Sequence, residues 1–528
     1  MKAASSPVQI PDTPVRDGGV SRRFFSNTIL NYGGQAFIIL LTFLTVPYTV
    51  HHLGPELFGI VALVQVTAGL AGLVNLGIGR ALTKYVSELY WKRDFQGINE
   101  LFRTAWATSL IAGLFGLILL IAPKEQIVRV FFRGGPEIST VTYFAVYVAA
   151  FGLFSSILLE TVSALPTALQ RFGIYNAINV AVGAMRAVGP VVVLAAGYSI
   201  KAVLIVILAS NFLAVGAFAA TACIFIPGLS LVPTFSWPTF KKLFRFSLPL
   251  LLSALFTLVI SRVDRFILAY YMPLASVTFF TLPYSISEKA YAGVTNITSV
   301  VLPFTSELHS IGVRDRLHKL YLQATKTMTI VSLPFTVILI ALPTPILRLW
   351  VGSEYAEQGS TVLMVLAAAT LLNAISGVAT ATSLGVGRVW QPAAFAFGAS
   401  AISLASNVAL IPLYGINGAA FSFLLPQLIV APLFVYVVTR TLAFPMLELL
   451  HYGFVRPIIC ASIQFLVLFF CREYVTSILA LGLLCLASLC LYGLLSVFVA
   501  ITSREREILF RTITSGVRKR SRNVLRNC

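Results

Sequence analysis

The chain has little charge. Charged residues make up 11% of its 528 residues, whereas an ordinary soluble protein carries about 25%. Hydrophobic residues make up 58%, and apolar segments of about 20 residues recur from one end to the other. This composition excludes an ordinary soluble protein and predicts a polytopic membrane protein.

Cysteine is also scarce. The six cysteines form no Cys-x-x-Cys pair; they are Cys223, Cys460, Cys471, Cys485, Cys490 and Cys528. This pattern predicts neither a disulfide framework nor a metal site, and we expect no cofactor. The N-terminal sequence lacks an early apolar core, so we expect 1–24 to be a disordered cytoplasmic tail rather than a signal peptide.

Hydropathy predicts fourteen transmembrane spans in an all-α fold. Their approximate limits are 26–50, 57–83, 102–123, 141–165, 173–196, 202–227, 244–272, 276–304, 325–347, 359–384, 389–411, 417–439, 453–471 and 475–501. The connections are short throughout. The longest, 305–324, is amphipathic and too small to be a domain.

Basic residues outnumber acidic residues by 38 to 19, and their location predicts the orientation. The connections on the side opposite the N-terminus hold six: Lys124, Arg129, Arg133, Lys201, Arg348 and Arg472. The connections on the N-terminal side and the two tails hold 27. By the positive-inside rule both termini lie in the cytoplasm, where the basic loops face anionic lipid headgroups. Nucleic acid is therefore not an expected partner.

An internal repeat divides the chain. The fifth span begins at Arg171 with Tyr198 27 residues later, and the eleventh begins at Arg388 with Tyr414 26 residues later. Each ends in Tyr-x-Ile-x-small. The repeat predicts two parallel six-helix lobes followed by two more helices. The predicted parts are the tail 1–24, a lobe over 25–228, a linker over 229–243, a lobe over 244–440, two helices in 441–502 and a basic cytoplasmic tail over 503–528.

The end of the second span resembles a known family. "LVNLGIGRALTKYVSE" (73–88) has a Leu-Gly-x-x-x-Ala-x-x-basic-Tyr pattern, formed by Leu76, Gly77, Ala81, Lys84 and Tyr85. The preceding turn carries Leu53, Gly54 and Gly59. Together with the 6+6+2 layout, these residues resemble polysaccharide exporters, including O-antigen and capsule flippases, of the multidrug/oligosaccharidyl-lipid/polysaccharide superfamily.

This resemblance implies an activity. A family member would move an undecaprenyl-diphosphate-linked oligosaccharide across the bacterial inner membrane by alternating access between two lobes. Membrane lipids and a polysaccharide polymerase would be its partners. Such a substrate needs a water-accessible path, cations for its phosphates and hydrogen-bonding groups for its sugars.

Charged residues within or beside the spans are therefore candidate site residues. The candidate phosphate ligands are Arg186, Arg262, Arg265, Lys289, Arg80 and Lys84. The candidate orienting or ion-coupling acids are Asp264, Glu288 and Glu160. The excess of base over acid favours an anionic headgroup, and coupling to H⁺ or Na⁺ is left open.

The stretch "LFTLVISRVDRFILAYYMP" (255–273) holds three of these residues. Arg262 and Arg265 are three apart and share a helical face. Asp264 points about 100° away from Arg265, so we expect it to find a partner on another helix instead of forming a local ion pair. The alternative is that both arginines reach the outer surface with their long side chains.

The remaining candidates also keep alternatives. Arg186, between Gly183 and Gly189, would bind phosphate where a neighbouring helix approaches closely; the alternative is a structural ion pair with Glu160. Asn27, Asn31, Gln35 and Asn75 form a polar set in the first two spans. Hydrogen bonding between helices explains that set as well as contact with sugar does.

Other functions are weighed against the flippase. A flippase for a peptidoglycan-precursor lipid and an H⁺- or Na⁺-coupled multidrug antiporter of the same superfamily stay open as alternatives. A polysaccharide polymerase or ligase would need a sizeable catalytic outer loop, and no predicted outer loop pairs carboxylates with a nearby His. We therefore expect a transporter and not an enzyme.

Overall fold

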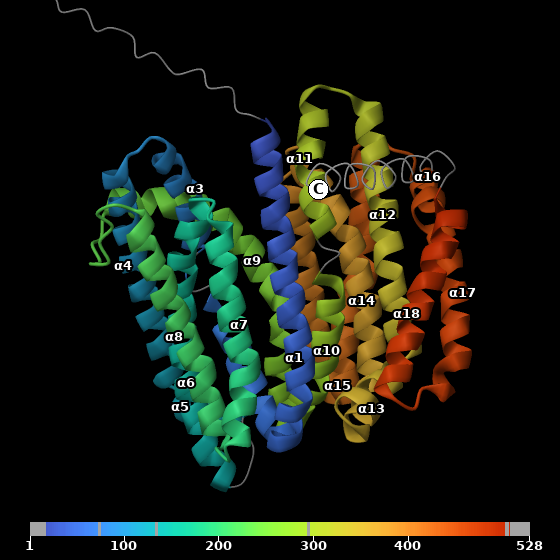
Figure 1. Cartoon of the computed structure of the whole chain (residues 1–528), viewed down its shortest axis with the longest axis horizontal. Coiled ribbons are helices and arrows are strands. Elements are labelled where there is room, and N and C mark those ends of the chain that lie inside the picture. The colour runs from blue at the N-terminus through green and yellow to red at the C-terminus, as the bar shows by residue number, and fades with distance from the viewer. Residues whose placement is uncertain are drawn as a thin grey trace, which may run out of the picture.

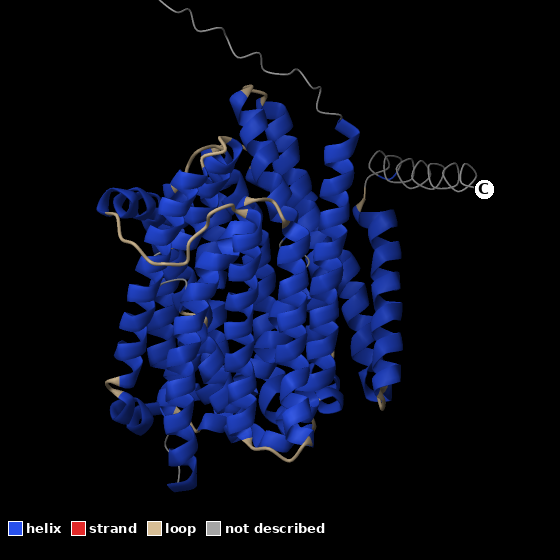
Figure 2. Ribbon diagram, turned by 60° about the vertical axis from the view of Figure 1, so that its left-hand side comes forward, coloured by secondary structure: helices blue, strands red, loops and turns tan. Residues whose placement is uncertain are grey.

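The structure is a computed structural model that describes residues 17–71, 75, 77–131, 136–292, 296–501 and 506. The described residues form helices joined by short turns, with no strand among them (Figure 2). The helices of the first half are α1 (Asp17–Ala68), α3 (Ile78–Trp91), α4 (Phe95–Ile121), α5 (Lys124–Phe131), α6 (Pro136–Ala168), α7 (Phe172–Ala195) and α8 (Ile200–Phe225). Those of the second half are α9 (Trp237–Tyr271), α10 (Leu274–Ala292), α11 (Asn296–Ser310), α12 (Arg314–Ala341), α13 (Pro343–Trp350), α14 (Ser353–Gly385), α15 (Trp390–Thr441), α16 (Met446–Leu450), α17 (Arg456–Cys471) and α18 (Ile478–Leu495).

The helices account for about fourteen membrane crossings. Ten helices of the described part are long and apolar enough to cross a membrane. Two of them, α1 and α15, bend at Gly54 and Gly415, which have positive φ angles of 74° and 57°. Only glycine adopts such angles without strain. The helix α15 contains two predicted spans, and α1 contains the first span and the beginning of the second. The other two predicted spans are the charged helix α9 and the α10–α11 pair.

One predicted span is interrupted within the described residues. The second was expected to be one helix over 57–83, but α1 ends at Ala68 and α3 begins at Ile78. The eighth was expected over 276–304; α10 covers its first part and α11 its last part, and residues 293–295 between them lie outside the described residues. The helix α1 also begins at Asp17, inside the tail expected over 1–24. Apolar composition alone does not reveal these boundaries.

The helices pack as two bundles side by side (Figure 1). In the first, α3, α4, α6 and α8 surround an apolar core that includes Leu82, Phe102, Leu165 and Phe218. In the second, α10, α12, α14 and α15 pack together, while α17 and α18 lie against the outside of α12. The helix α1 packs against both α7 and α10, and α9 packs against both α3 and α15. These two helices therefore join the bundles.

The bundles are tightly joined near the bend of α1, at the lower end of Figure 1. The Thr278 hydroxyl donates a hydrogen bond to the Pro55 carbonyl over 2.5 Å. The Trp350 indole donates to the Phe43 carbonyl over 2.7 Å and stacks on the Phe43 ring, with centroids 5.0 Å apart. The turn between α11 and α12 and the helix α16 lie at the opposite, upper end.

Candidate functional site

The charged stretch of α9 contains a buried local ion pair. Asp264 and Arg265 are 1% and 2% exposed. Asp264 Oδ1 accepts the Arg265 backbone N–H over 2.8 Å and lies 3.6 Å from Arg265 Nη1. Our expectation that Asp264 pairs with another helix was wrong. Although the two Cα–Cβ bonds diverge, the long Arg265 side chain folds back to the neighbouring carboxylate, because both charges are out of water.

Arg265 is held by α10 as well. Its guanidinium carbon lies 4.1 Å from the centre of the Tyr284 ring and 5.7 Å from that of Phe280, within cation–π range. Its Nη1 donates to the Ser261 carbonyl over 2.7 Å. This enclosure fixes α9 against α10 and leaves no open side for a phosphate in this arrangement. The burial of Arg265 also contradicts the alternative that its side chain extends to the outer surface.

Arg262, one turn earlier, is placed differently. It is half-buried, and it reaches the point just after α1 where the second span is interrupted: a Cβ on Gly69 would lie 3.6 Å from both its Cζ and its Nη1. Gly69 and the nearby Gln65 are exposed. Within the described residues no ion pair or hydrogen bond engages this guanidinium. Arg262 is thus a cation presented between the two bundles.

Asn75 lies between the two halves of the second span and is fully buried. Its Nδ2 donates to Glu160 Oε2 over 3.3 Å and to Thr161 Oγ1 over 3.4 Å, and its Oδ1 accepts the Ser109 hydroxyl over 2.9 Å. Asn75 therefore joins helices α4 and α6 and is not available to a sugar. The hydrogen bond from Asn75 also fixes the carboxylate of Glu160. The second half of the span then begins at Gly77, with a φ of 67°.

Arg186 lies on α7 and binds α8. Its Nε donates to Ser210 Oγ over 3.0 Å, and its Nη2 donates to Asn211 Oδ1. The alternative pair with Glu160 is thus not formed, because two polar side chains of the neighbouring helix satisfy the guanidinium. Arg186 still keeps an exposed part.

The glycines beside Arg186 allow the close approach that we expected. A Cβ on Gly183 would lie 2.8 Å from Ile38 Cδ1 of α1. A Cβ on Gly189 would lie 2.4 Å from Val206 Cγ1 of α8. These contacts bring α7 against both of its neighbours and fix the height of Arg186 between them.

The other candidates are spread over several surfaces. Glu288 is exposed and Lys289 is half-buried on α10, and the described part of the chain gives neither a salt bridge. Arg80 is exposed near Glu160, and Lys84 lies 4.0 Å from Glu88. Gln35 is exposed on α1, while the side chain of Asn31 lies outside the described residues. The structure thus brings Arg262, Asp264 and Arg265 together near Tyr284, and Arg80 near Glu160 and Asn75. It leaves Arg186 and Lys84 apart.

Sequence reasoning missed Tyr284, Ser210 and Asn211. The only available signal for Tyr284 was its place on α10 one turn before Glu288, since residues four apart share a helix face. Ser210 and Asn211 interrupt the apolar run of α8, and a polar pair within a membrane helix is a signal for an interhelical partner.

The sequence is similar to a known protein family and to a known transporter. Residues 52–360 match the family model described as "Polysaccharide biosynthesis protein". The "Putative O-antigen transporter" of Shigella flexneri is 24% identical over 420 residues, which cover 78% of this chain and 97% of that protein.

Solved structures share the fold. The lipid II flippase MurJ in an inward closed conformation has a TM-score of 0.69 at 15% identity, covering 90% of this chain and 98% of that one. An inward-facing multidrug MATE transporter of the MOP superfamily has a TM-score of 0.63 at 15% identity, covering 78% and 94%. Since the family model matches more than half of the residues, this chain belongs to the polysaccharide biosynthesis protein family.

Proposed function

We propose that this protein is a flippase that moves an undecaprenyl-diphosphate-linked oligosaccharide across the bacterial inner membrane by alternating access. The observation that carries the proposal is Arg262: a half-buried cation with no ion pair among the described residues, between the two bundles and against the broken second span. A charge kept within a membrane span is costly and is a functional-site signal. Family membership and the O-antigen transporter relative support the same substrate class.

Arginine suits a diphosphate. Its planar guanidinium donates two parallel hydrogen bonds to phosphate oxygens and stays charged when partly desolvated. Arg262 is the proposed main ligand, and the exposed part of Arg186 is a second one. In this proposal the Asp264–Arg265 pair positions α9, and so directs Arg262, instead of touching substrate.

Alternating access requires the bundles to separate at one end and close at the other. With both termini in the cytoplasm, the tight contacts of Thr278 with Pro55 and of Trp350 with Phe43 lie at the outer end. We infer that the structure is closed to the outside, and that these contacts break when the substrate leaves. Glu288, exposed and without a described ion pair, is the proposed coupling acid if a cation gradient drives the cycle.

The test is transport in proteoliposomes that contain a fluorescent undecaprenyl-diphosphate oligosaccharide. Arg262→Ala should lower the rate at least tenfold, while Arg262→Lys, which keeps the charge and loses the fork, should lose less. Arg472→Ala is the control, since that side chain lies over Phe469 on α17, away from the bundle interface. A wild-type rate for Arg262→Ala would refute the proposed role.

A parallel assay with a peptidoglycan-precursor lipid distinguishes between the possible substrate classes. Faster movement of that lipid than of the oligosaccharide lipid would replace the proposed substrate. Movement of an organic cation with neither lipid transported would point to an antiporter.

A further inference from the structure

A second cationic site lies at the other end of α9. A pocket of about 570 Å³ is lined by Tyr85, Pro238, Lys241, Lys242, Arg245 and Phe246. Its walls are the middle of α3, in the first bundle, and the first turns of α9, the helix that joins the bundles. Its volume falls within the range of small-molecule sites.

The pocket is cationic on one wall. Lys241, Lys242 and Arg245 are all exposed, and no acidic side chain is among the lining residues. The described part of the chain assigns none of the three a salt bridge. Lys241 and Arg245 are four apart and share a helix face. Like charges so arranged repel one another and raise the local concentration of an anion.

Two aromatic rings hold the ammonium groups in place. Lys242 Nζ lies 4.5 Å from the centre of the Tyr85 ring. Lys84 Nζ lies 4.4 Å from the centre of the Phe246 ring and 4.0 Å from Glu88. The two rings meet edge to face, with centroids 5.8 Å apart. Cation–π contacts of this kind restrict flexible lysine side chains before a ligand arrives.

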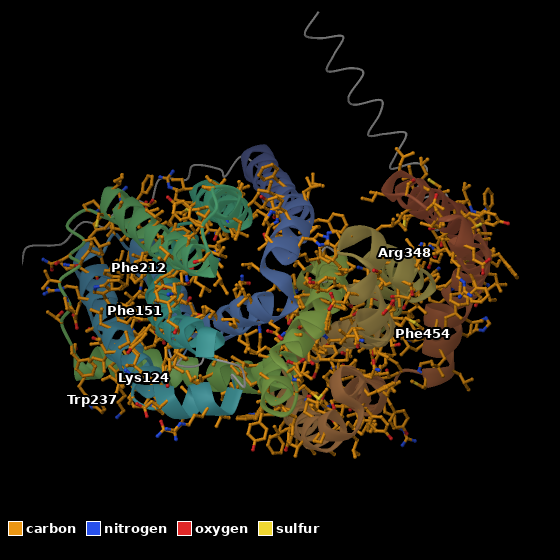
Figure 3. The ribbon with its side chains drawn as sticks, turned by 90° about the horizontal axis from the view of Figure 1, so that it is seen from below. Lys124, Phe151, Phe212, Trp237, Arg348 and Phe454 are labelled. Carbon is orange, nitrogen blue, oxygen red and sulfur yellow. The ribbon has the colours of Figure 1, made fainter. Side chains whose placement is uncertain are left out.

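Neighbouring aromatics indicate the depth of the pocket in the bilayer. Phe235, Trp237 and Phe240 form a cluster with ring centroids 5.5–6.2 Å apart, and Trp237 is 64% exposed. Figure 3 shows Trp237 at the periphery of the molecule. Exposed tryptophan beside lysine and arginine is typical of the level of the lipid headgroups. The pocket therefore opens where phosphates of membrane lipids lie.

The helix α9 is also bonded, beside the pocket, to the broken second span and to α4. Ser247 Oγ donates to the Gly77 carbonyl over 3.1 Å, and Thr239 Oγ1 donates to Glu100 Oε1 over 2.8 Å. Arg245 and Arg262 lie on one helix, roughly 25 Å apart at 1.5 Å per residue. The same helix thus carries a headgroup-level cationic site and a deeper cation.

We propose that this pocket binds the phosphate groups of a lipid headgroup and that its ligand is the diphosphate of the transported lipid before it enters the membrane interior. The identity of the lipid that carries the phosphate rests on the proposed function, whereas phosphate binding itself is inferred from the pocket alone. Lysine supplies compact positive charge and Arg245 supplies two parallel donors. Basic pockets between membrane helices bind lipid phosphates in this way.

The test is binding, not transport. The full-length protein in phosphatidylcholine nanodiscs is titrated with a fluorescent undecaprenyl diphosphate. The Lys241→Gln, Lys242→Gln, Arg245→Gln triple variant should bind at least tenfold more weakly than the wild type. The control variant removes three exposed charges elsewhere, Arg316→Gln, Lys319→Gln and Arg388→Gln, and should change the affinity less than twofold.

A charge-preserving variant guards against misfolding. Lys241→Arg, Lys242→Arg, Arg245→Lys should bind within threefold of the wild type; a loss equal to that of the glutamine variant would overturn the phosphate site. Equal losses in the pocket and control variants would also overturn it, because they would indicate general surface charge.

Competition with phosphatidylglycerol separates the two phosphate sources. If the pocket variant loses phosphatidylglycerol binding and keeps undecaprenyl diphosphate binding, the ligand is bulk lipid and the proposed occupant is wrong. Because the assay needs no turnover, pocket-dependent binding in a protein that transports nothing would refute the proposed function and leave the pocket intact. Unchanged binding with intact transport would refute the pocket alone.

Discussion

The buried pair of Asp264 and Arg265 makes a quantitative prediction. Replacing Asp264 by Ala leaves the Arg265 guanidinium 2% exposed with no carboxylate. Breaking a buried ion pair in this way costs about 3–5 kcal/mol. The pair is incompletely satisfied, since neither Asp264 Oδ2 nor Arg265 Nε has a described partner, and Tyr284 keeps its cation–π contact. We therefore expect the lower value, about 3 kcal/mol.

The assay is the free energy of unfolding of the purified protein, measured by denaturant titration in detergent micelles. The double variant Asp264→Leu, Arg265→Met removes both charges and fills similar volume, so it should be within about 1 kcal/mol of the wild type or more stable. The argument fails if Asp264→Ala is within about 1 kcal/mol of the wild type, or if the double variant is as unstable as the single one.

The same variants separate two roles of Arg265. If Arg265 only positions α9, the double variant should keep most of its transport, because Arg262 is untouched. If Arg265 binds phosphate in another conformation, transport should fall as far as it does in Arg262→Ala. The stability measurement and the transport measurement are independent.

Two further predictions test close contacts. Gly59→Ala would place a Cβ 2.4 Å from the Leu274 carbonyl oxygen. It should therefore lower the free energy of unfolding by about 1–3 kcal/mol through overpacking between α1 and α10. Thermal unfolding measures this, and the control Gly216→Ala, whose Cβ would meet no atom within 4 Å, should be neutral. Asn75→Ala removes hydrogen bonds to three side chains, so it should lower the free energy of unfolding by about 1–3 kcal/mol. The control Asn179→Ala, whose amide bonds a carbonyl of its own helix, should change stability little. Equal effects of the two variants would contradict a structural role of Asn75 between helices.

Hydropathy predicted most helix limits well. The fifth span was expected over 173–196 and α7 covers Phe172–Ala195, while the sixth was expected over 202–227 and α8 covers Ile200–Phe225. The length of an apolar run is set by the bilayer, so composition determines these helices. In the interrupted second span, by contrast, Asn75 bonds partners distant in sequence, namely Ser109, Glu160 and Thr161, which hydropathy does not reveal.

The partners of the charged residues were harder to predict. The sequence located Arg186, Arg262 and Arg265 within the spans, but it could not give their rotamers. An arginine side chain spans more than one helical turn, so its guanidinium can meet groups on another face or on a neighbouring helix. Arg186 therefore meets α8, and Arg265 returns to Asp264 beside it.

The local ion pair explains why α9 carries three charges. Two arginines three residues apart repel each other, and Asp264 forms its salt bridge with Arg265. The stretch therefore has one net positive charge, and Arg262 carries it against Gly69. Among the described residues Arg262 makes no salt bridge, which supports the proposal that an anionic substrate compensates its charge. In our proposal the pocket at Lys241 and Arg245 on the same helix holds this anion first.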